Sequence, residues 1–267
     1  RYQVTNMGKV TQDDILYSFD KTPTKDNLLQ SWSGKITVNS ELNNSNDVKI
    51  IIYAVDNAGN ESKDSVSIKI DITDPEIHIS YNNNAPDSGS YYKNDRTATI
   101  TISERNFNAD DVKVTITNTD GVIPKISGWT KHEGTGNLDN TTYTATITYA
   151  ADADYTFDIE YTDLAANACP GETFAAGTAT PSEFTIDKTN PVVSVSYDNN
   201  DVANEKYFKA ARTATVTIVE HNFDVARVKF AMNAGRGGVV PNVRWTHNGD
   251  RHIATISYTV DGDYTFD

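Results

Sequence analysis

Residues 96–102 read Arg-Thr-Ala-Thr-Ile-Thr-Ile, and residues 212–218 read Arg-Thr-Ala-Thr-Val-Thr-Ile. Polar and apolar side chains alternate along both segments, as expected for a β-strand with one face in a core and the other toward water. The segments begin 116 positions apart, at 96 and at 212. A repeat of this length indicates that one β-rich domain occurs at least twice in the chain.

Other segments recur in the same order. The matching pairs are Asp71–Pro75 with Asp187–Pro191, Glu104–Phe107 with Glu220–Phe223, Trp129 with Trp245, and Asp154–Asp158 with Asp263–Asp267. The last pair is 109 positions apart instead of 116. The difference falls between Trp129 and Ala145, in a Gly- and Asn-containing stretch that we interpret as a loop, where insertions are tolerated.

The repeat gives the predicted domain boundaries. Asp56-Asn-Ala-Gly-Asn60 resembles Asp163-Leu-Ala-Ala-Asn167, which indicates a third and more divergent copy upstream. We therefore predict domains at 1–72, 73–188 and 189–267, with N-terminal truncation of the first as an alternative. Since Asp267 corresponds to Asp158, we expect the third domain to be truncated at its C-terminus and to lack the counterpart of the last strand.

The repeated unit reads as a β-sandwich. No stretch shows a 3.6-residue period, and turn residues interrupt the chain every ~8–12 positions, which is typical of many short strands. Tyr155 and Phe157, like Tyr264 and Phe266, have the spacing of the tyrosine corner of immunoglobulin-like strands, with Phe in place of the usual Cys. The alternative is that these aromatic residues are only core residues of a hairpin.

Composition excludes several partners. The formal net charge is −14, and nucleic-acid binding depends on clustered Lys and Arg, so we expect no nucleic-acid partner. We expect no membrane insertion, because no run approaches the ~20 apolar residues of a membrane span.

The single cysteine, Cys169, cannot form an intrachain disulfide.

The chain resembles the immunoglobulin-like tandem repeats of bacterial surface proteins, mostly from Gram-positive organisms. The resemblance is carried by Tyr53–Asn60, by Ile70–Pro75 and Ile186–Pro191, and by Asp261–Phe266. It implies an all-β fold of tandem immunoglobulin-like β-sandwiches arranged as an elongated rod. It also implies an extracellular location, at the cell surface or cell wall or in a secreted protein.

Calcium-site candidates are few. Asp198, Asp201, Asp71 and Asp74 offer the oxygen ligands that calcium prefers. The alternative is turn chemistry, since Asp and Asn bond their own backbone in turns. We expect no other cofactor.

The sequence contains candidates for two further kinds of site. Trp129 and Trp245 are candidates for a sugar-stacking surface, with core packing as the alternative. Lys93 with Glu104 and Asn106, and the repeated set Lys209 with Glu220 and Asn222, could form Lys–Asn cross-links, although solvated surface residues are the alternative. No nucleophile, phosphate-loop or zinc-protease motif occurs in the sequence, and we predict no enzyme activity.

The sequence therefore favours a non-catalytic structural spacer or stalk. The alternative is an adhesin or glycan-binding module, which could be accessory to a secreted hydrolase. The partner of such a module would be a host or plant glycan or a surface protein.

The third domain should be the least stable, or it should borrow a strand from a neighbouring molecule, because a missing strand leaves an open edge and exposed core positions. Thermal unfolding combined with sedimentation should show this. A monomer in which residues 189–267 melt at the same temperature as residues 73–188 would contradict the prediction.

Overall fold

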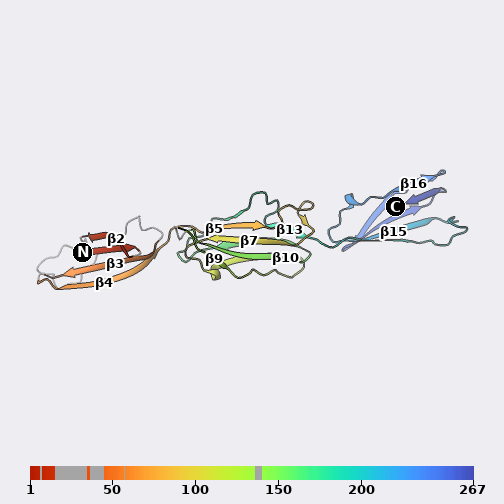
Figure 1. Cartoon of the computed structure of the whole chain (residues 1–267). Helices are drawn as coiled ribbons and strands as arrows, with labels where there is room; N and C mark the ends of the chain where they lie inside the picture. Colours follow the sequence, from red (N-terminus) through yellow and green to blue (C-terminus); the bar gives the residue numbers. More distant parts are fainter. Residues whose placement is uncertain (7, 16–34, 37–44, 57, 136–139) are drawn as a thin grey trace. The chain divides into compact units, whose positions relative to one another are not determined.

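The computed structural model describes residues 1–6, 8–15, 35–36, 45–56, 58–135 and 140–267 (Figure 1). The described residues form strands joined by turns and short 3₁₀ segments, with no α-helix among them. Consistent with this, none of them lies in a helix long and apolar enough to cross a membrane. The chain divides into two units, residues 1–186 (unit 1) and residues 187–267 (unit 2). The predicted boundary at 188/189 lies two residues beyond this division, and the one at 72/73 lies within unit 1.

Unit 1 begins with a four-stranded antiparallel sheet. Its strands are β1 (Tyr2–Asn6), β2 (Lys9–Ile15), β3 (Ser45–Val55) and β4 (Glu61–Ile70), in the order β2-β1-β3-β4. Tyr2, Val4 and Val48 form a small core on this sheet. Val48, Ile50 and Ile52, which occupy every second position of their segment, lie on β3, and this strand pairs with both β1 and β4.

Residues 76–186 form a β-sandwich, which we call the central module. One sheet has the order β12-β5-β7-β10-β9 and the other β6-β13-β11-β8. The strands are β5 (Glu76–Tyr81), β6 (Tyr91–Tyr92), β7 (Arg96–Ser103), β8 (Val112–Asn118), β9 (Thr130–His132), β10 (Thr142–Tyr149), β11 (Ala153–Tyr161), β12 (Glu172–Phe174) and β13 (Glu183–Ile186).

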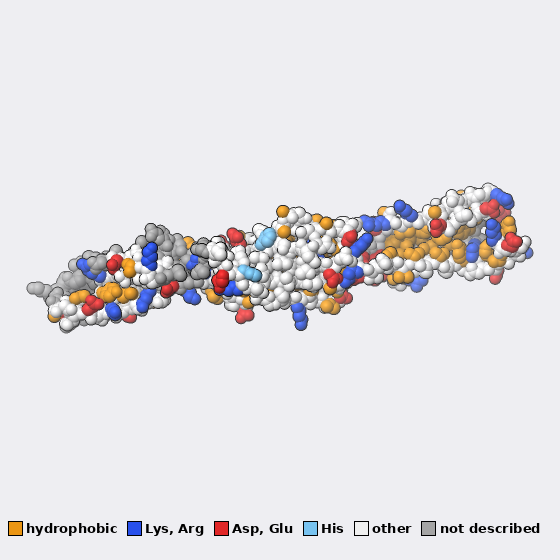
Figure 2. Space-filling view, viewed as in Figure 1, with side chains coloured by type: hydrophobic (Ala, Val, Ile, Leu, Met, Phe, Trp, Pro, Cys, Tyr) orange, Lys and Arg blue, Asp and Glu red, His pale blue; other side chains and the backbone are white. Residues whose placement is uncertain are grey.

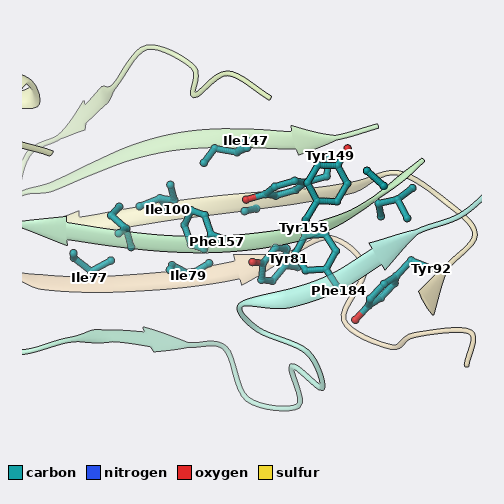
Figure 3. Close-up of a cluster of buried hydrophobic side chains, with 14 of the residues drawn as sticks. Ile77, Ile79, Tyr81, Tyr92, Ile100, Ile147, Tyr149, Tyr155, Phe157 and Phe184 are labelled. Atoms are coloured by element: carbon teal, nitrogen blue, oxygen red, sulfur yellow. The ribbon is translucent and has the colours of Figure 1, made fainter. Parts of the chain in front are cut away.

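Alternation along β7 and β11 places one face of each strand in a shared core. Burial alternates residue by residue over both strands, as the sequence pattern predicts. Sixteen buried side chains from the two sheets make one cluster, which includes Ile77, Ile100, Phe157 and Phe184 (Figure 3). The core is therefore built between the two sheets.

The centre of this core is an aromatic box around Phe184, which is 3% exposed. Its ring centroid lies 4.9–6.0 Å from those of four tyrosines, Tyr81, Tyr92, Tyr149 and Tyr155 (Figure 3). The guanidinium of Arg96, a fully buried residue, lies 4.5 Å from the Phe184 ring centroid. Strand β13 thus closes the core by inserting one ring between the two sheets.

The tyrosine corner is present in both copies. The Tyr155 hydroxyl donates to the Ala151 carbonyl at 2.9 Å, and the Tyr264 hydroxyl donates to the Val260 carbonyl at 2.7 Å. Each bond spans four residues and fixes the turn that leads into the strand. The aromatic pairs read from the sequence therefore do more than fill a hairpin core.

Unit 2 repeats part of the central module. Its larger sheet has the order β14-β15-β18-β17, and its smaller sheet contains β16 and β19. The strands are β14 (Val192–Tyr197), β15 (Arg212–Val219), β16 (Met232–Gly235), β17 (Val243–Asn248), β18 (Arg251–Tyr258) and β19 (Asp263–Phe266). Five buried side chains form its core, against sixteen in the central module, which is the pattern expected of a smaller and less closed core.

Replacing Phe184 with Ala should lower the free energy of unfolding of the central module by about 3–5 kcal/mol, because the substitution empties the aromatic box. Hydrogen exchange of β11 and β13 amides across a guanidinium titration measures the loss locally. Val122→Ala, at an exposed loop position, is the matched control and should stay within about 0.5 kcal/mol of the wild type. Equal effects of the two substitutions would contradict this account of the core.

Candidate functional site

Three carboxylates meet at one end of the central module. Asp71 follows β4, Glu104 follows β7 and Asp163 follows β11. One carboxylate oxygen of each residue lies within 4.8 Å of those of the other two. Glu104 and Asp163 are only 4% and 5% exposed, and Asp71 is half-buried. We call these three residues the acidic cluster.

The loop after β11 holds Asp163 in place. Its Oδ1 accepts hydrogen bonds from the backbone N–H groups of Ala165 and Asn167, both at 2.8 Å, and its Oδ2 accepts one from Asn167 Nδ2 at 2.8 Å. The first copy is built in the same way, because Asp56 accepts hydrogen bonds from the Ala58 and Asn60 backbone and from the Asn60 side chain. Those bonds lower the pKa of Asp56, with the Asn60 side chain as the largest cause. The Asp-x-x-x-Asn resemblance noted in the sequence is therefore a shared loop structure.

Asn106 connects the other two members of the cluster. Its backbone N–H donates to Glu104 Oε1 at 2.5 Å, and its side-chain amide donates to Asp71 Oδ2. The Asp71 carbonyl also accepts a hydrogen bond from Asn167 Nδ2 at 3.2 Å. Asp71, which immediately follows the first sheet, is thus bonded to two loops of the central module.

Unit 2 contains the same arrangement. The Asn222 backbone N–H donates to Glu220 Oε1 at 2.8 Å, and Asn222 Nδ2 donates to Asp187 Oδ2 at 3.2 Å. The Glu-x-Asn segment and the junction Asp therefore interact in both copies. The Glu-x-Asn segment and the junction Asp recur together in the sequence, but the repeat alone did not show that Glu104 and Asp71 lie close to each other.

The acidic cluster has the chemistry of a calcium ligand set. Carboxylate oxygens are the preferred ligands of calcium, which takes 6–8 oxygens in flexible geometry. Three carboxylates could supply part of such a shell, with backbone oxygens and water supplying the rest. Of the four residues predicted from sequence, Asp71 alone belongs to this cluster.

The other three predicted calcium ligands lie elsewhere. Within the described part of the chain, Asp74, Asp198 and Asp201 belong to no group of three close metal-ligating side chains. Asp198 accepts a hydrogen bond from the Thr213 backbone N–H at 2.7 Å, and this bond lowers the pKa of the Asp198 carboxyl. The Asp201 backbone N–H donates to Asn199 Oδ1 at 3.0 Å. The Asn199 bond to Asp201 is of the kind that the turn-chemistry alternative expects, whereas Asp198 bonds the neighbouring strand β15. The calcium role of both aspartates stays a prediction.

The geometry does not favour the Lys–Asn cross-link. Lys93 precedes β7 and Glu104 follows it, so the eight residues of the strand lie between them. At ~3.3 Å per residue the two positions are at opposite ends of the strand. Lys93 is also exposed, whereas a cross-link of this kind needs a buried lysine beside the acid.

The two tryptophans pack on aromatic neighbours. Trp129 is half-buried, with its ring centroid 5.0 Å from that of Phe107. Trp245 is half-buried against Phe223 and Phe230, at 5.2 and 5.9 Å. Both therefore cover the edge of a hydrophobic core, and a sugar-binding role for either stays a prediction.

The calcium hypothesis predicts that calcium stabilises the central module. At a free calcium concentration about 100 times the Kd, the gain would be about 2.7 kcal/mol. Thermal unfolding with calcium, and with a chelator, measures it. Glu104→Gln should remove the gain while keeping an acceptor for Asn106, and Asp74→Asn is the matched control that should retain it. A wild-type melting temperature that is the same in both conditions would contradict the hypothesis.

Comparisons with known proteins give weak structural likeness to solved structures and nothing more specific. No family model and no curated protein matches the chain. Among solved structures, the chain is similar to FdeC, an adhesin of Escherichia coli, with 14% identity, a TM-score of 0.30, and coverage of 82% of this chain and 67% of that one.

Proposed function

We propose that the chain is a series of immunoglobulin-like modules that serve as a non-catalytic spacer in a bacterial cell-surface or secreted protein. The observation that carries this proposal is the repeated junction. In both copies an Asp directly follows the last strand of the preceding sheet and is hydrogen-bonded by the module that follows it.

The strand order of the central module supports an immunoglobulin-like assignment. In chain order, and apart from the two short strands β6 and β12, the seven strands fall into the sheets β5-β7-β10-β9 and β13-β11-β8. This is the A-B-E-D and G-F-C order of constant-type immunoglobulin domains. Unit 2 repeats the first sheet as β14-β15-β18-β17, and β16 and β19 take the places of strands C and F.

The junctions leave little free chain. Asp71 directly follows the end of β4, and Asp187 directly follows the end of β13. Each accepts a hydrogen bond at 3.2 Å from the backbone N–H two residues later, at Thr73 and Thr189. Pro75 and Pro191 then restrict the backbone just before the next strand. A spacer needs short, bonded connections of this kind rather than flexible Gly/Ser linkers.

The tryptophan packing favours the spacer over the glycan-binding alternative. A sugar-stacking platform needs an open aromatic face, whereas Trp129 and Trp245 pack against Phe side chains at the edges of their cores. The acidic composition fits a solvated module that repels its neighbours, since like charges keep proteins soluble and apart.

The spacer proposal predicts no glycan binding by the 267-residue chain. The test is a panel of immobilised host and plant glycans, probed with and without calcium. Silence in both conditions supports the proposal. Reproducible binding that is lost in folded Trp129→Ala or Trp245→Ala, but kept in the exposed control Tyr91→Ala, would replace the spacer with an adhesin.

A further inference from the structure

Unit 2 has a pair of histidines on neighbouring strands. β17 and β18 are joined by the two-residue turn Gly249-Asp250, and in their register His247 lies directly opposite His252. Gly249 has a φ of 56°, as the first residue of a tight hairpin turn often does. Side chains that face each other on paired antiparallel strands have Cβ atoms about 4.5–5.5 Å apart. The local hairpin alone therefore brings the two imidazoles together.

The spacing of the two rings suits a shared metal ion. The ring centroids of His247 and His252 are 6.2 Å apart, with an angle of 31° between the ring planes. A zinc–imidazole bond is about 2.0–2.1 Å long, so two such bonds and the half-width of each ring span a separation of this size. His247 is exposed, and its ring can turn toward an ion without disturbing the core. The pair thus has the geometry of a two-histidine chelate.

The His252 ring is held in a fixed orientation. Its Nε2 lies 3.0 Å from the Glu220 carbonyl oxygen, and its ring centroid lies 3.9 Å from that of Phe223. A carbonyl oxygen can only accept, so Nε2 carries the proton, and Nδ1 of the neutral ring keeps its lone pair. Histidines that bind metals are generally oriented by such a hydrogen bond from their other ring nitrogen. His252 is therefore positioned as a ligand before an ion binds.

The loop after β15 also fastens the hairpin turn. The Glu220 backbone N–H donates to the Asp250 carbonyl at 2.9 Å. His221 Nδ1 lies 3.0 Å from Asp250 Oδ1, and since a carboxylate accepts, the imidazole is the donor. The turn is thus bonded through its backbone and through a side chain. A ligand pair that is already ordered loses little conformational entropy when an ion binds.

The equivalent hairpin of the central module has no such pair. There the opposed residues are Lys131 on β9 and Tyr143 on β10. Lys131 Nζ lies 2.6 Å from Glu133 Oε1, and this hydrogen bond raises the pKa of Lys131. A protonated ammonium has no lone pair to give to a metal. The histidine pair therefore belongs to unit 2 and is not part of the repeated fold.

The histidines of the central module lie apart from each other. Figure 2 shows pale-blue histidine side chains on the surface of this module. His78 is on β5 and His132 is on β9, and β7 and β10 lie between these two strands in the sheet. At about 4.8 Å per strand, three strand spacings put them roughly 14 Å apart, too far for one ion. They serve as single, exposed histidines for comparison.

We propose that His247 and His252 form a binding site for one divalent transition-metal ion of the Ni²⁺, Cu²⁺ and Zn²⁺ group, with water completing its coordination. Imidazole nitrogen suits these ions, whereas Ca²⁺ and Mg²⁺ prefer oxygen ligands. Among the described residues, no third metal-ligating side chain forms a close group with the pair. The site is separate from the acidic cluster, goes beyond the spacer role and does not depend on it.

The test is a calorimetric titration of the 267-residue chain with Cu²⁺, Ni²⁺ and Zn²⁺ in the presence of excess Ca²⁺. Calcium competes for oxygen-ligand sites such as the acidic cluster, so the remaining signal reports nitrogen ligands. We expect one ion per chain, with Cu²⁺ bound more tightly than Ni²⁺ or Zn²⁺. Zn²⁺ should protect the amides of β17 and β18 from hydrogen exchange and leave those of β9 and β10 unchanged.

Two variants each remove one ligand. His247→Lys and His252→Tyr introduce the residues that the central module has at these positions, and each should weaken Cu²⁺ binding at least about tenfold. His132→Gln removes an exposed histidine of the central module and is the matched control, which should bind as the wild type does. Because His247 is exposed, its replacement should leave unit 2 folded, and His247→Lys decides the test even if His252→Tyr does not fold.

Three results would overturn the proposed metal site. They are an absence of Cu²⁺ binding to a chain whose unit 2 is folded, equal Cu²⁺ affinity of the wild type and His247→Lys, and zinc-dependent protection that lies outside β17 and β18.

Discussion

The buried guanidinium of Arg96 is the interaction on which the central module depends. A charge placed in a hydrophobic core is costly unless its hydrogen bonds and its charge are compensated. Here Arg96 Nε and Nη1 donate to the carbonyls of Asn83 and Thr180 at 3.0 and 2.7 Å, and the guanidinium lies over three aromatic rings. Burial lowers the pKa of Arg96, and nearby phenols oppose that shift. Because the two carbonyls come from segments on either side of the core, one side chain links β7 to the approach of β13.

The tyrosines around this charge are also fixed by burial. Desolvation raises the pKa of Tyr81 to about 12, with the Arg96 charge acting against it, and it raises the pKa of Tyr149 well above its ordinary value. These phenols therefore stay neutral over the physiological range. The Tyr81 hydroxyl donates to the Pro181 carbonyl, and the Tyr149 ring packs edge-on against Tyr155 and Phe184. The Tyr81 and Tyr92 hydroxyls bond Pro181 and Thr180, which lie two and three positions before the start of β13. The last strand of the module is held by polar contacts at its entry and by an apolar ring at its centre.

The features that were predictable from sequence are the local ones. Strand alternation follows from a two-residue period and is seen along β7 and β11, and the tyrosine corner, expected from a Tyr and a Phe two positions apart, is present in both copies. The acidic cluster was not predictable, because Asp71, Glu104 and Asp163 come from three distant segments and only the sandwich brings them together. The role of Arg96 was missed for the same reason. An Arg at the start of a strand reads as a surface residue, and its burial depends on rings from three other strands, β5, β6 and β13.

Comparison of equivalent positions separates local constraints from those imposed by tertiary structure. Gly59 and Ala166 occupy the same place in the Asp-x-x-x-Asn loop, and both adopt positive φ, at 86° and 71°. The loop therefore dictates the backbone conformation even where the side chain opposes it, since Ala has a steric penalty at positive φ that Gly avoids.

At the other extreme, Ile77 and Val193 lie in similar strands and differ almost completely in exposure. Burial at that position is decided by the strands that cover it. An alternating pattern therefore predicts which face of a strand is apolar, but it does not predict how far other strands bury that face.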